Sequence, residues 1–235
     1  MTDTRQPTAR NRVRRVPANA RYDRESIHRV LDRGLVAHVS FIDDGQPYGI
    51  PTLYARVGDR VLIHGSTASR MTRVLAAGAP ACVTVTILDG LVLARSAFET
   101  GANYDAVMLL GSFRQIDGEA EKLAALETFM ETVLPGRWSE VRPPSRQELK
   151  GTAILELEIS EASVKTKAGG PDDDESPDAE RETWAGVIPV LTSYGSPEPS
   201  PALPSSIPMS ASVRRLLSEP PGFRSRVVRA GDGES

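Results

Sequence analysis

The chain has 235 residues, 40% of them hydrophobic, which is enough for one substantial core. No apolar run approaches the roughly 20 residues that span a bilayer, and no hydrophobic stretch near the N-terminus is typical of a secretory signal. We therefore expect no membrane association and no export. The net charge of -3 argues against a nucleic-acid partner. Cys82 is the single cysteine, which excludes an intrachain disulfide and a cysteine-based zinc site and favours the cytoplasm.

The two ends of the chain differ from its middle. The first twenty residues lack hydrophobic periodicity, and the last forty contain seven prolines. We predict a disordered arm at residues 1–20, a folded domain at 21–192 and a Pro-rich, largely disordered tail at 193–235. Within that tail, residues 212–217 are expected to form a short helix, because their apolar side chains fall on one face.

The first elements of the domain are marked by local signals. Asp23 is a plausible N-cap for a helix with an apolar face at Ile27, Val30 and Leu31, and Gly34 is placed to end it. Strands are expected at 35–42 and 47–54, joined by the turn Asp43-Asp44-Gly45-Gln46. A third strand is expected at 60–65.

The rest of the domain continues this pattern. We expect a helix at 68–77, a strand at 81–88, a turn at Asp89-Gly90 and a strand at 91–97. A long strand at 104–116, a helix at 119–133 and a final strand at 152–159 follow. Many short antiparallel strands with few helices predict a mainly β protein, a closed or nearly closed barrel with flanking helices. No Gly-x-Gly-x-x-Gly or Walker sequence supports a Rossmann or P-loop domain.

The segment from Ser66 to Arg70 is a candidate phosphate site. It ends a strand and opens a helix, where free N–H groups, the hydroxyls of Ser66 and Ser69, and the Arg70 guanidinium favour an anion. Ordinary N-capping by Ser66 or Thr67, with Arg70 solvated, explains the same residues.

His64 precedes this segment and could lie beside whatever it binds. A lone strand histidine is more often structural than catalytic, and neither His28 nor His38 is spaced to form a metal site with it. We therefore expect no metal site.

Two further segments could line a pocket. Asn103 and Tyr104 follow a loop of small and polar residues and could hydrogen-bond a planar ligand, or merely begin the next strand. The apolar island at residues 184–189 either caps a pocket or pins the tail to the barrel.

Taken together, several segments resemble one known family. The segments are Gly34–Val39, Gly45–Pro51, His64-Gly65-Ser66, Ser69-Arg70, Leu91–Phe98, Asn103-Tyr104 and Trp184–Pro189. In order and spacing they are similar to the pyridoxamine 5'-phosphate oxidase-like flavin-binding split barrels, and to the flavin-nucleotide-binding branch related to nitroimidazole resistance reductases. The resemblance covers about residues 20–192.

The resemblance implies a six-stranded antiparallel Greek-key split barrel that forms a homodimer with FMN at the subunit interface. It implies that Ser66, Ser69 and Arg70 hold the phosphate and that His64 is the catalytic residue near the flavin. The other cofactor-binding positions that it implies are Ile50, Pro51, Thr52 and Leu53 along the isoalloxazine, with Ile63, Met71, Asn103 and Tyr104.

The sequence departs from the family pattern before and after Asn103-Tyr104. Related proteins usually read Phe-His-His-Ser-Met-Asn-Tyr-Arg-Ser-Val, whereas this chain has Glu99 and Thr100 in place of the histidines and Asp105 in place of the arginine. If Asp105 faced an anionic cofactor, the repulsion would cost on the order of 1 kcal/mol. Positions 99, 100, 105 and 106 therefore inherit no role.

Three functions remain open at this stage. The first is an FMN-dependent oxidoreductase acting on a small organic substrate, with a reduced nicotinamide as the default electron donor. The second is a non-catalytic dimeric barrel that has lost the flavin, which Glu99 and Asp105 favour. The third is a related barrel that binds haem or a deazaflavin, with His64 as a possible ligand of haem iron.

Overall fold

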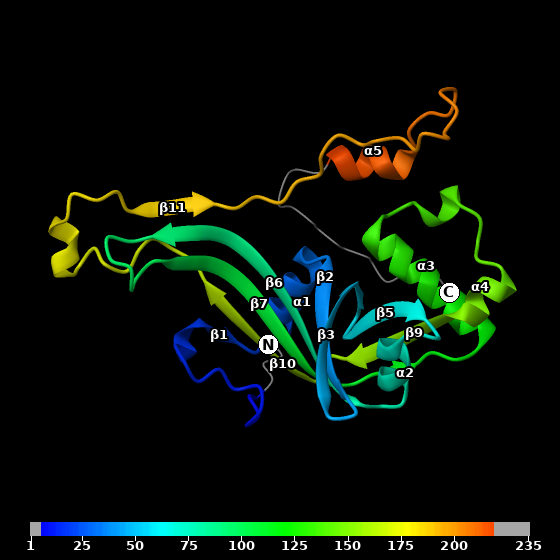
Figure 1. The fold of residues 1–235 in the computed structure, drawn as a ribbon, viewed down its shortest axis with the longest axis horizontal. Coiled ribbons are helices and arrows are strands. Elements are labelled where there is room, and N and C mark those ends of the chain that lie inside the picture. The colour runs from blue at the N-terminus through cyan, green and yellow to red at the C-terminus, as the bar shows by residue number, and fades with distance from the viewer. Residues whose placement is uncertain (1–5, 219–235) are drawn as a thin grey trace, which may run out of the picture.

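The computed structural model describes residues 6–218 and consists of two antiparallel sheets with helices around them (Figure 1). The larger sheet has the order β1-β10-β7-β6-β2-β3, with β11 also paired to β6, and the smaller has the order β4-β5-β9-β8. The strands of the larger sheet are β1 (Ala20–Arg21), β2 (Val36–Asp43), β3 (Gln46–Leu53), β6 (Pro80–Leu93), β7 (Gly101–Ser112), β10 (Glu161–Lys167) and β11 (Gly186–Pro189). Those of the smaller are β4 (Ala55–Val57), β5 (Arg60–Ser66), β8 (Arg114–Gln115) and β9 (Thr152–Glu158).

The two sheets enclose one main core without closing into a single barrel. Val39 and Val83 of the larger sheet and Ile63 and Leu155 of the smaller are fully buried in the same cluster. The prediction of a mainly β split barrel with flanking helices is therefore confirmed. The strand count exceeds the expected six because short strands such as β1, β8 and β11 pair at sheet edges.

The first helix follows its sequence signals. The side chain of Asp23 accepts a hydrogen bond from the N–H of Ser26 and begins α1 (Arg24–Arg33). The buried face is Ile27, Val30 and Leu31, as expected, and α1 packs across β6, β7 and β10. The hairpin that follows also agrees, because Asp44 and Gly45 both have positive φ, 50° and 74°, as a tight turn between β2 and β3 requires.

The predicted turn at Asp89-Gly90 is wrong. β6 runs without a break from Pro80 to Leu93, and its pairing with β7 shifts between Leu88 and Gly90, so Asp89 is the extra residue of a β-bulge. A side chain at residue 90 would come within 3.1 Å of the Ile188 carbonyl oxygen of β11, so glycine permits the close approach of that strand. β6 and β7 form a long curved arm that extends away from the barrel (Figure 1).

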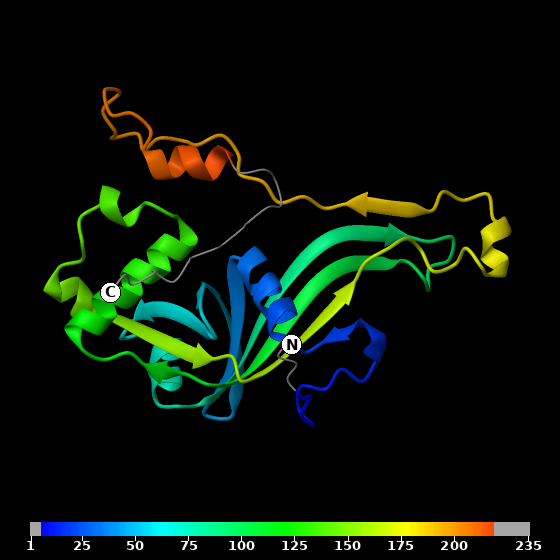
Figure 2. The ribbon, with the colours of Figure 1, turned by 180° about the vertical axis from the view of Figure 1, so that it is seen from behind.

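Five helices and three short 3-10 turns are described besides the strands. After α1 come α2 (Arg70–Ala76), α3 (Glu119–Val133), α4 (Arg146–Gly151) and α5 (Ala211–Ser218), with turns at Pro17–Asn19, Trp138–Glu140 and Pro177–Glu180. α3 and α4 lie at the end of the molecule opposite the arm, beside β4 and β9 (Figure 2). The expected helices at 68–77 and 119–133 therefore form nearly as predicted.

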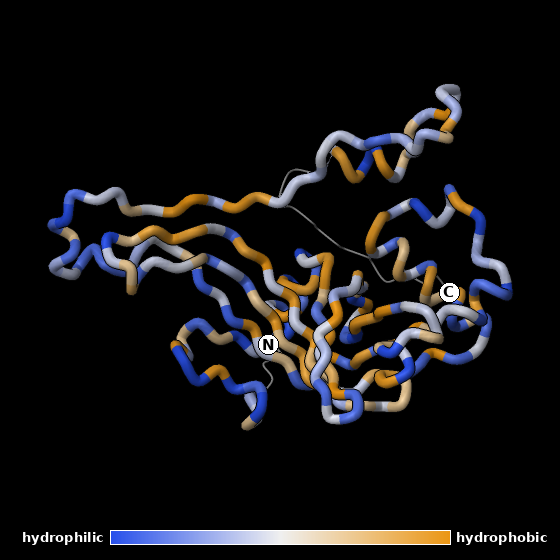
Figure 3. The backbone as a smooth tube through the Cα atoms, viewed as in Figure 1, coloured by the Kyte–Doolittle hydropathy of each residue, from blue (hydrophilic) through white to orange (hydrophobic). Residues whose placement is uncertain are grey.

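The segments nearest the two ends of the described residues both contact the rest of the fold. Asn11 is buried and its amide donates to the Ala162 carbonyl oxygen, so residues 6–19 differ from the disorder expected for the N-terminal arm. Beyond β11 the chain has no regular structure until α5, which forms at the predicted helix. Hydrophobic residues run along β6 and β11 (Figure 3), and Leu91 and Ile188 are both more than 40% exposed there.

Candidate functional site

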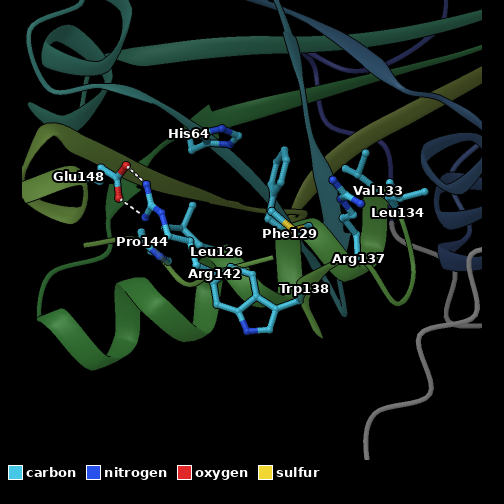
Figure 4. Close-up of a pocket in the computed structure, with 11 residues that line it drawn as sticks. His64, Leu126, Phe129, Val133, Leu134, Arg137, Trp138, Arg142, Pro144 and Glu148 are labelled. Atoms are coloured by element: carbon cyan, nitrogen blue, oxygen red, sulfur yellow. Dashed lines mark hydrogen bonds and ion pairs between the residues drawn. The ribbon is translucent and has the colours of Figure 1, made fainter. Parts of the chain in front are cut away.

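A cavity of about 620 Å³ lies between β5 and α3. Its walls are mostly apolar, and its polar lining comes from one histidine, two arginines and a glutamate. The lining residues are His64, Leu126, Phe129, Met130, Val133, Leu134, Arg137, Trp138, Arg142, Pro144 and Glu148. Figure 4 shows His64 facing the side chains of α3 across this space. The volume is that of a site for a compact organic ligand or cofactor.

His64 reaches the cavity because β5 alternates its side chains. Ile63 points into the core and is fully buried, so His64 points to the other face, where its ring meets Phe129 edge-on at a centroid distance of 4.5 Å. Burial lowers the pKa of the imidazole. The ring is therefore neutral at physiological pH, the form in which an imidazole nitrogen binds a metal.

The Nδ1 atom of His64 is buried and has no hydrogen-bond partner among the described residues. A buried polar atom without a partner costs about 1–3 kcal/mol, so such atoms point to a ligand or a functional role. Tyr54, by contrast, is fully buried with its hydroxyl bonded to the Leu31 carbonyl oxygen.

Charged side chains stand at the cavity wall. Arg142 donates two hydrogen bonds to Glu148, at 2.8 and 2.7 Å, and both residues line the cavity (Figure 4). Glu148 also accepts from the Ser145 N–H in a capping box that begins α4, and these bonds lower its pKa. Arg137 lies 3.2 Å from Glu140 and is 37% exposed.

The predicted phosphate segment lies outside this cavity. Ser69 caps α2 by accepting from the Thr72 N–H, and the Ser66 side chain accepts from the Ala68 N–H. The Arg70 guanidinium lies 4.5 Å above the Tyr48 ring and 3.3 Å from Asp43. Ordinary capping therefore occurs here, while Arg70 remains half exposed and able to meet an anion.

The β3 residues lie on an edge strand near this segment. Ile50, Pro51, Thr52 and Leu53 pair with Val39, His38, Ala37 and Val36 of β2, and their other edge has no strand partner among the described residues. Tyr48 of the same strand also lines a second hollow of about 630 Å³ with Cys82 and Ser112. The side chains of Ile63 and Met71 pack in the core, so they are not available to a cofactor placed here.

Asn103 and Tyr104 lie near the start of β7, opposite Gly90 and Leu88 of β6. The Asn103 amide donates to the Gly169 carbonyl oxygen at 2.9 Å, and its side-chain oxygen is buried without a described partner. Neither residue lines the cavity at His64. Within one chain, Arg70 therefore lies near β3. His64 lines a different cavity, and Asn103-Tyr104 lie in the arm.

Asp105, the residue that departs from the family pattern, is buried against α1. It is 2% exposed and accepts hydrogen bonds from Thr166 at 2.6 Å, Arg33 at 2.6 Å and Arg29 at 3.3 Å. Two cations from α1 neutralise it. The replacement of an arginine by Asp105 therefore gives β7 a carboxylate that binds α1.

Sequence reasoning missed most of the His64 cavity. The α3 helix was predicted, but the face that meets β5 depends on long-range packing, and Arg137 and Arg142 lie in a connection with no motif of its own. The alternation of Ile63 and His64 was the one local signal that separated a core side from an outer side. Over residues 6–218, no cluster of three or more His, Cys, Asp or Glu residues could hold a metal ion, and no helix is long and apolar enough to cross a membrane.

The fold defines a split-barrel protein with a cavity between a sheet and a flanking helix. The pyridoxamine 5'-phosphate oxidase family model matches residues 23–166, and the chain belongs to that family. A comparison with curated proteins found no match.

Two solved structures are similar over most of the chain. The flavocytochrome Anf3 from Azotobacter vinelandii is 40% identical, with a TM-score of 0.84, over 89% of this chain and 97% of that one. A FAD and haem binding protein from Mycobacterium smegmatis is 40% identical, with a TM-score of 0.81, over 84% of this chain and 97% of that one. A putative 5-nitroimidazole resistance protein from Bacteroides thetaiotaomicron, 17% identical with a TM-score of 0.51 over 62% of this chain and 85% of that one, shares the fold.

Proposed function

We propose that the protein is an electron-transfer flavoprotein that binds a haem in the His64 cavity and a flavin at the segment from Ser66 to Arg70. The observation that carries the proposal is the neutral, partly buried His64 in an apolar cavity of about 620 Å³ with arginines at its wall. The similarity at 40% identity to a flavocytochrome and to a FAD and haem binding protein supports it.

The residues of the cavity suit a haem in three ways. The imidazole of His64 supplies an iron ligand, the apolar side chains of Leu126, Phe129 and Val133 suit a flat macrocycle, and arginines suit its carboxylates. A haem supplies one-electron chemistry and a flavin supplies one- or two-electron chemistry. The protein residues orient the groups, exclude water and hold the histidine neutral.

The flavin part of the proposal has less specific support than the haem part. Arg70, half exposed over Tyr48, and the start of α2 favour a phosphate-bearing cofactor, and the family resemblance favours FMN. The similar protein from M. smegmatis binds FAD. A reduced nicotinamide as electron donor and a small organic substrate remain part of the proposal.

The homodimer also belongs to the proposal. Leu88, Leu91 and Ile188 of the arm are each more than 40% exposed, and a second copy of the chain would cover such residues. The exposed strand β3 lies open in a single copy, which suits a flavin site completed by the partner subunit.

Absorption spectra of the purified protein test the proposal. Haemin, FMN and FAD are added separately, the unbound fraction is removed, and the spectra are compared for the native chain, His64→Ala and the control His38→Ala, whose histidine is exposed on β2. We expect a Soret band in the native chain and in His38→Ala, its loss or shift in His64→Ala, and bound flavin in all three. If the native chain binds flavin but not haemin, the flavin-dependent oxidoreductase is favoured. If it binds neither, the non-catalytic barrel is favoured.

A further inference from the structure

One carboxylate bonds α5 to the connection after α3, whose Arg137 and Trp138 line the cavity. The Ser212 N–H donates to Glu140 Oε1 at 2.9 Å, and the Ser212 hydroxyl donates to Glu140 Oε2 at 2.5 Å. Glu140 therefore caps the first turn of a helix more than seventy residues away, where the helix dipole favours a negative charge. The arrangement lowers the pKa of Glu140 to about 2, mainly through the Ser212 hydroxyl.

This polar contact involves the most buried residue of α5. Ser212 is the one buried residue of the helix, at 2% exposure, and Val213, Leu216 and Leu217 are only partly covered. At the same contact, a side chain at residue 136 would come within 3.6 Å of the Arg215 guanidinium. The helix thus lies against the connection that follows α3.

Glu140 has a second partner in Arg137. The Arg137 Nη1 atom lies 3.2 Å from Glu140 Oε2 and 3.4 Å from the Ser210 hydroxyl, and Arg137 also lines the cavity. Both contacts of Arg137 are long for charge-assisted or ordinary hydrogen bonds, whereas those of Ser212 are short. The carboxylate is therefore held more closely by α5 than by Arg137.

The other arginine of the cavity is already neutralised. Arg142 forms a bidentate pair with Glu148, and Glu148 also lines the cavity, so this pair adds little net charge. The positive charge available to a ligand then depends on Arg137, and on how completely Glu140 neutralises it.

We propose that α5 draws the Glu140 carboxylate away from Arg137 and so keeps the Arg137 guanidinium available to an anionic group of the ligand in the His64 cavity. Glu140 and Ser212 are positioning residues in this scheme. For haem as the ligand, this scheme rests on the proposed function. The C-terminal segment then selects ligands of the cavity by their charge. By linkage, an anionic ligand in the cavity also strengthens the docking of α5.

The first test compares matched ligands in the full-length chain. Haemin is titrated against its dimethyl ester, which lacks the carboxylate charges, and anilinonaphthalene sulfonate is titrated against neutral phenylnaphthylamine. In Ser212→Ala we expect haemin and the sulfonate to bind at least about threefold more weakly, a difference of about 0.7 kcal/mol, with little change for the neutral ligands. The matched control Ser218→Ala, at the other end of α5 and away from Glu140, should change none of them.

A double variant separates charge competition from a structural defect. Adding Glu140→Gln to Ser212→Ala removes the carboxylate that would neutralise Arg137, so we expect the affinity for the anionic ligands to return. Trypsin, which cleaves after Arg214 and Arg215 of α5, should cut more slowly when an anionic ligand is bound.

Equal weakening of charged and neutral ligands in Ser212→Ala, or no recovery in the double variant, would overturn the inference. The naphthalene probes keep this result independent of the haem. If the native chain binds neither haemin nor its ester, the proposed function fails, while the sulfonate series still supports or overturns the role of α5.

Discussion

The His64 cavity and the Ser66–Arg70 segment differ in how complete they are within one chain. The cavity is lined by β5, α3 and the connection after α3, and His64 there has a buried nitrogen with no described partner. The Ser66–Arg70 segment lies beside the open edge of β3, its serines bond to their own helix, and Arg70 is 52% exposed. The cavity is therefore formed within the single chain, whereas the proposed flavin segment lies at an open sheet edge in one copy.

Filling the cavity should give the largest effect. In Leu126→Trp the larger ring occupies the space between α3 and His64, so we expect haemin affinity to fall at least about 100-fold, while flavin affinity stays the same. Spectral titration with haemin and FMN measures both. Leu191→Trp, at a residue 74% exposed, is the control. Equal loss of flavin and haem would show that the two sites are not separate.

Removing the Asp105 charge should reduce the stability of the fold without changing its affinity for flavin. Asp105→Asn loses charge-assisted bonds to Arg33 and Arg29, so we expect the free energy of unfolding to fall by about 2 kcal/mol in urea titrations. Asp44→Asn in the exposed β2–β3 turn is a matched control, because asparagine tolerates its positive φ. A marked gain in FMN affinity in Asp105→Asn would contradict our placement of this carboxylate away from the cofactor.

The phosphate role of Arg70 predicts a moderate effect. Arg70→Ala should weaken FMN at least about tenfold, because a charge-assisted bond worth roughly 1.5–3 kcal/mol is lost. Arg73→Ala, on the exposed side of α2, should leave FMN affinity unchanged. Fluorescence quenching of FMN measures the affinity, and equal affinities of native chain and Arg70→Ala would remove Arg70 from the flavin site.

The buried histidine predicts the smallest effect, in the pH dependence of stability. Burial lowers the pKa of His64 in the folded state, so the unfolded chain takes up a proton at higher pH than the folded chain does. The free energy of unfolding therefore decreases as pH falls through the ordinary histidine range. Between about pH 7.5 and about pH 5.5, the Tm of the native chain should fall by about a degree more than that of His64→Phe. His28, whose pKa burial also lowers, leaves a residual dependence in both proteins.

Local signals predicted most of the fold. The Asp23 cap, the Asp44-Gly45 turn and the apolar face of α1 each depend on neighbours in the sequence, and each is confirmed. The Asp89-Gly90 dipeptide failed as a turn because its conformation depends on two distant partners. Arg33 bonds to the Asp89 carboxylate, and the Val190 N–H bonds to its carbonyl oxygen.

The candidate site was predicted in part for the same reason. A helix after β5 was predicted, but its N-cap is Ser69 and not Ser66 or Thr67. The outward side of His64 follows from the strand period. The pairing of Asp105 with two arginines, and the meeting of Glu140 with Ser212, join elements far apart in the sequence. No spacing in the sequence encodes them, because the sheet topology brings them together.

The pairing of β11 with β6 also affects the solubility of the arm. β2 occupies one edge of β6 only from Ala81 to Thr84, and β11 covers the same edge from Gly90 to Leu93. Without β11, that part of β6 would present free backbone donors and acceptors beside apolar side chains, a template for strand addition between chains. Cleavage between β10 and β11 should therefore allow the arm to self-associate. The acidic loop at residues 171–182 connects β10 to the strand that covers this edge and so limits aggregation.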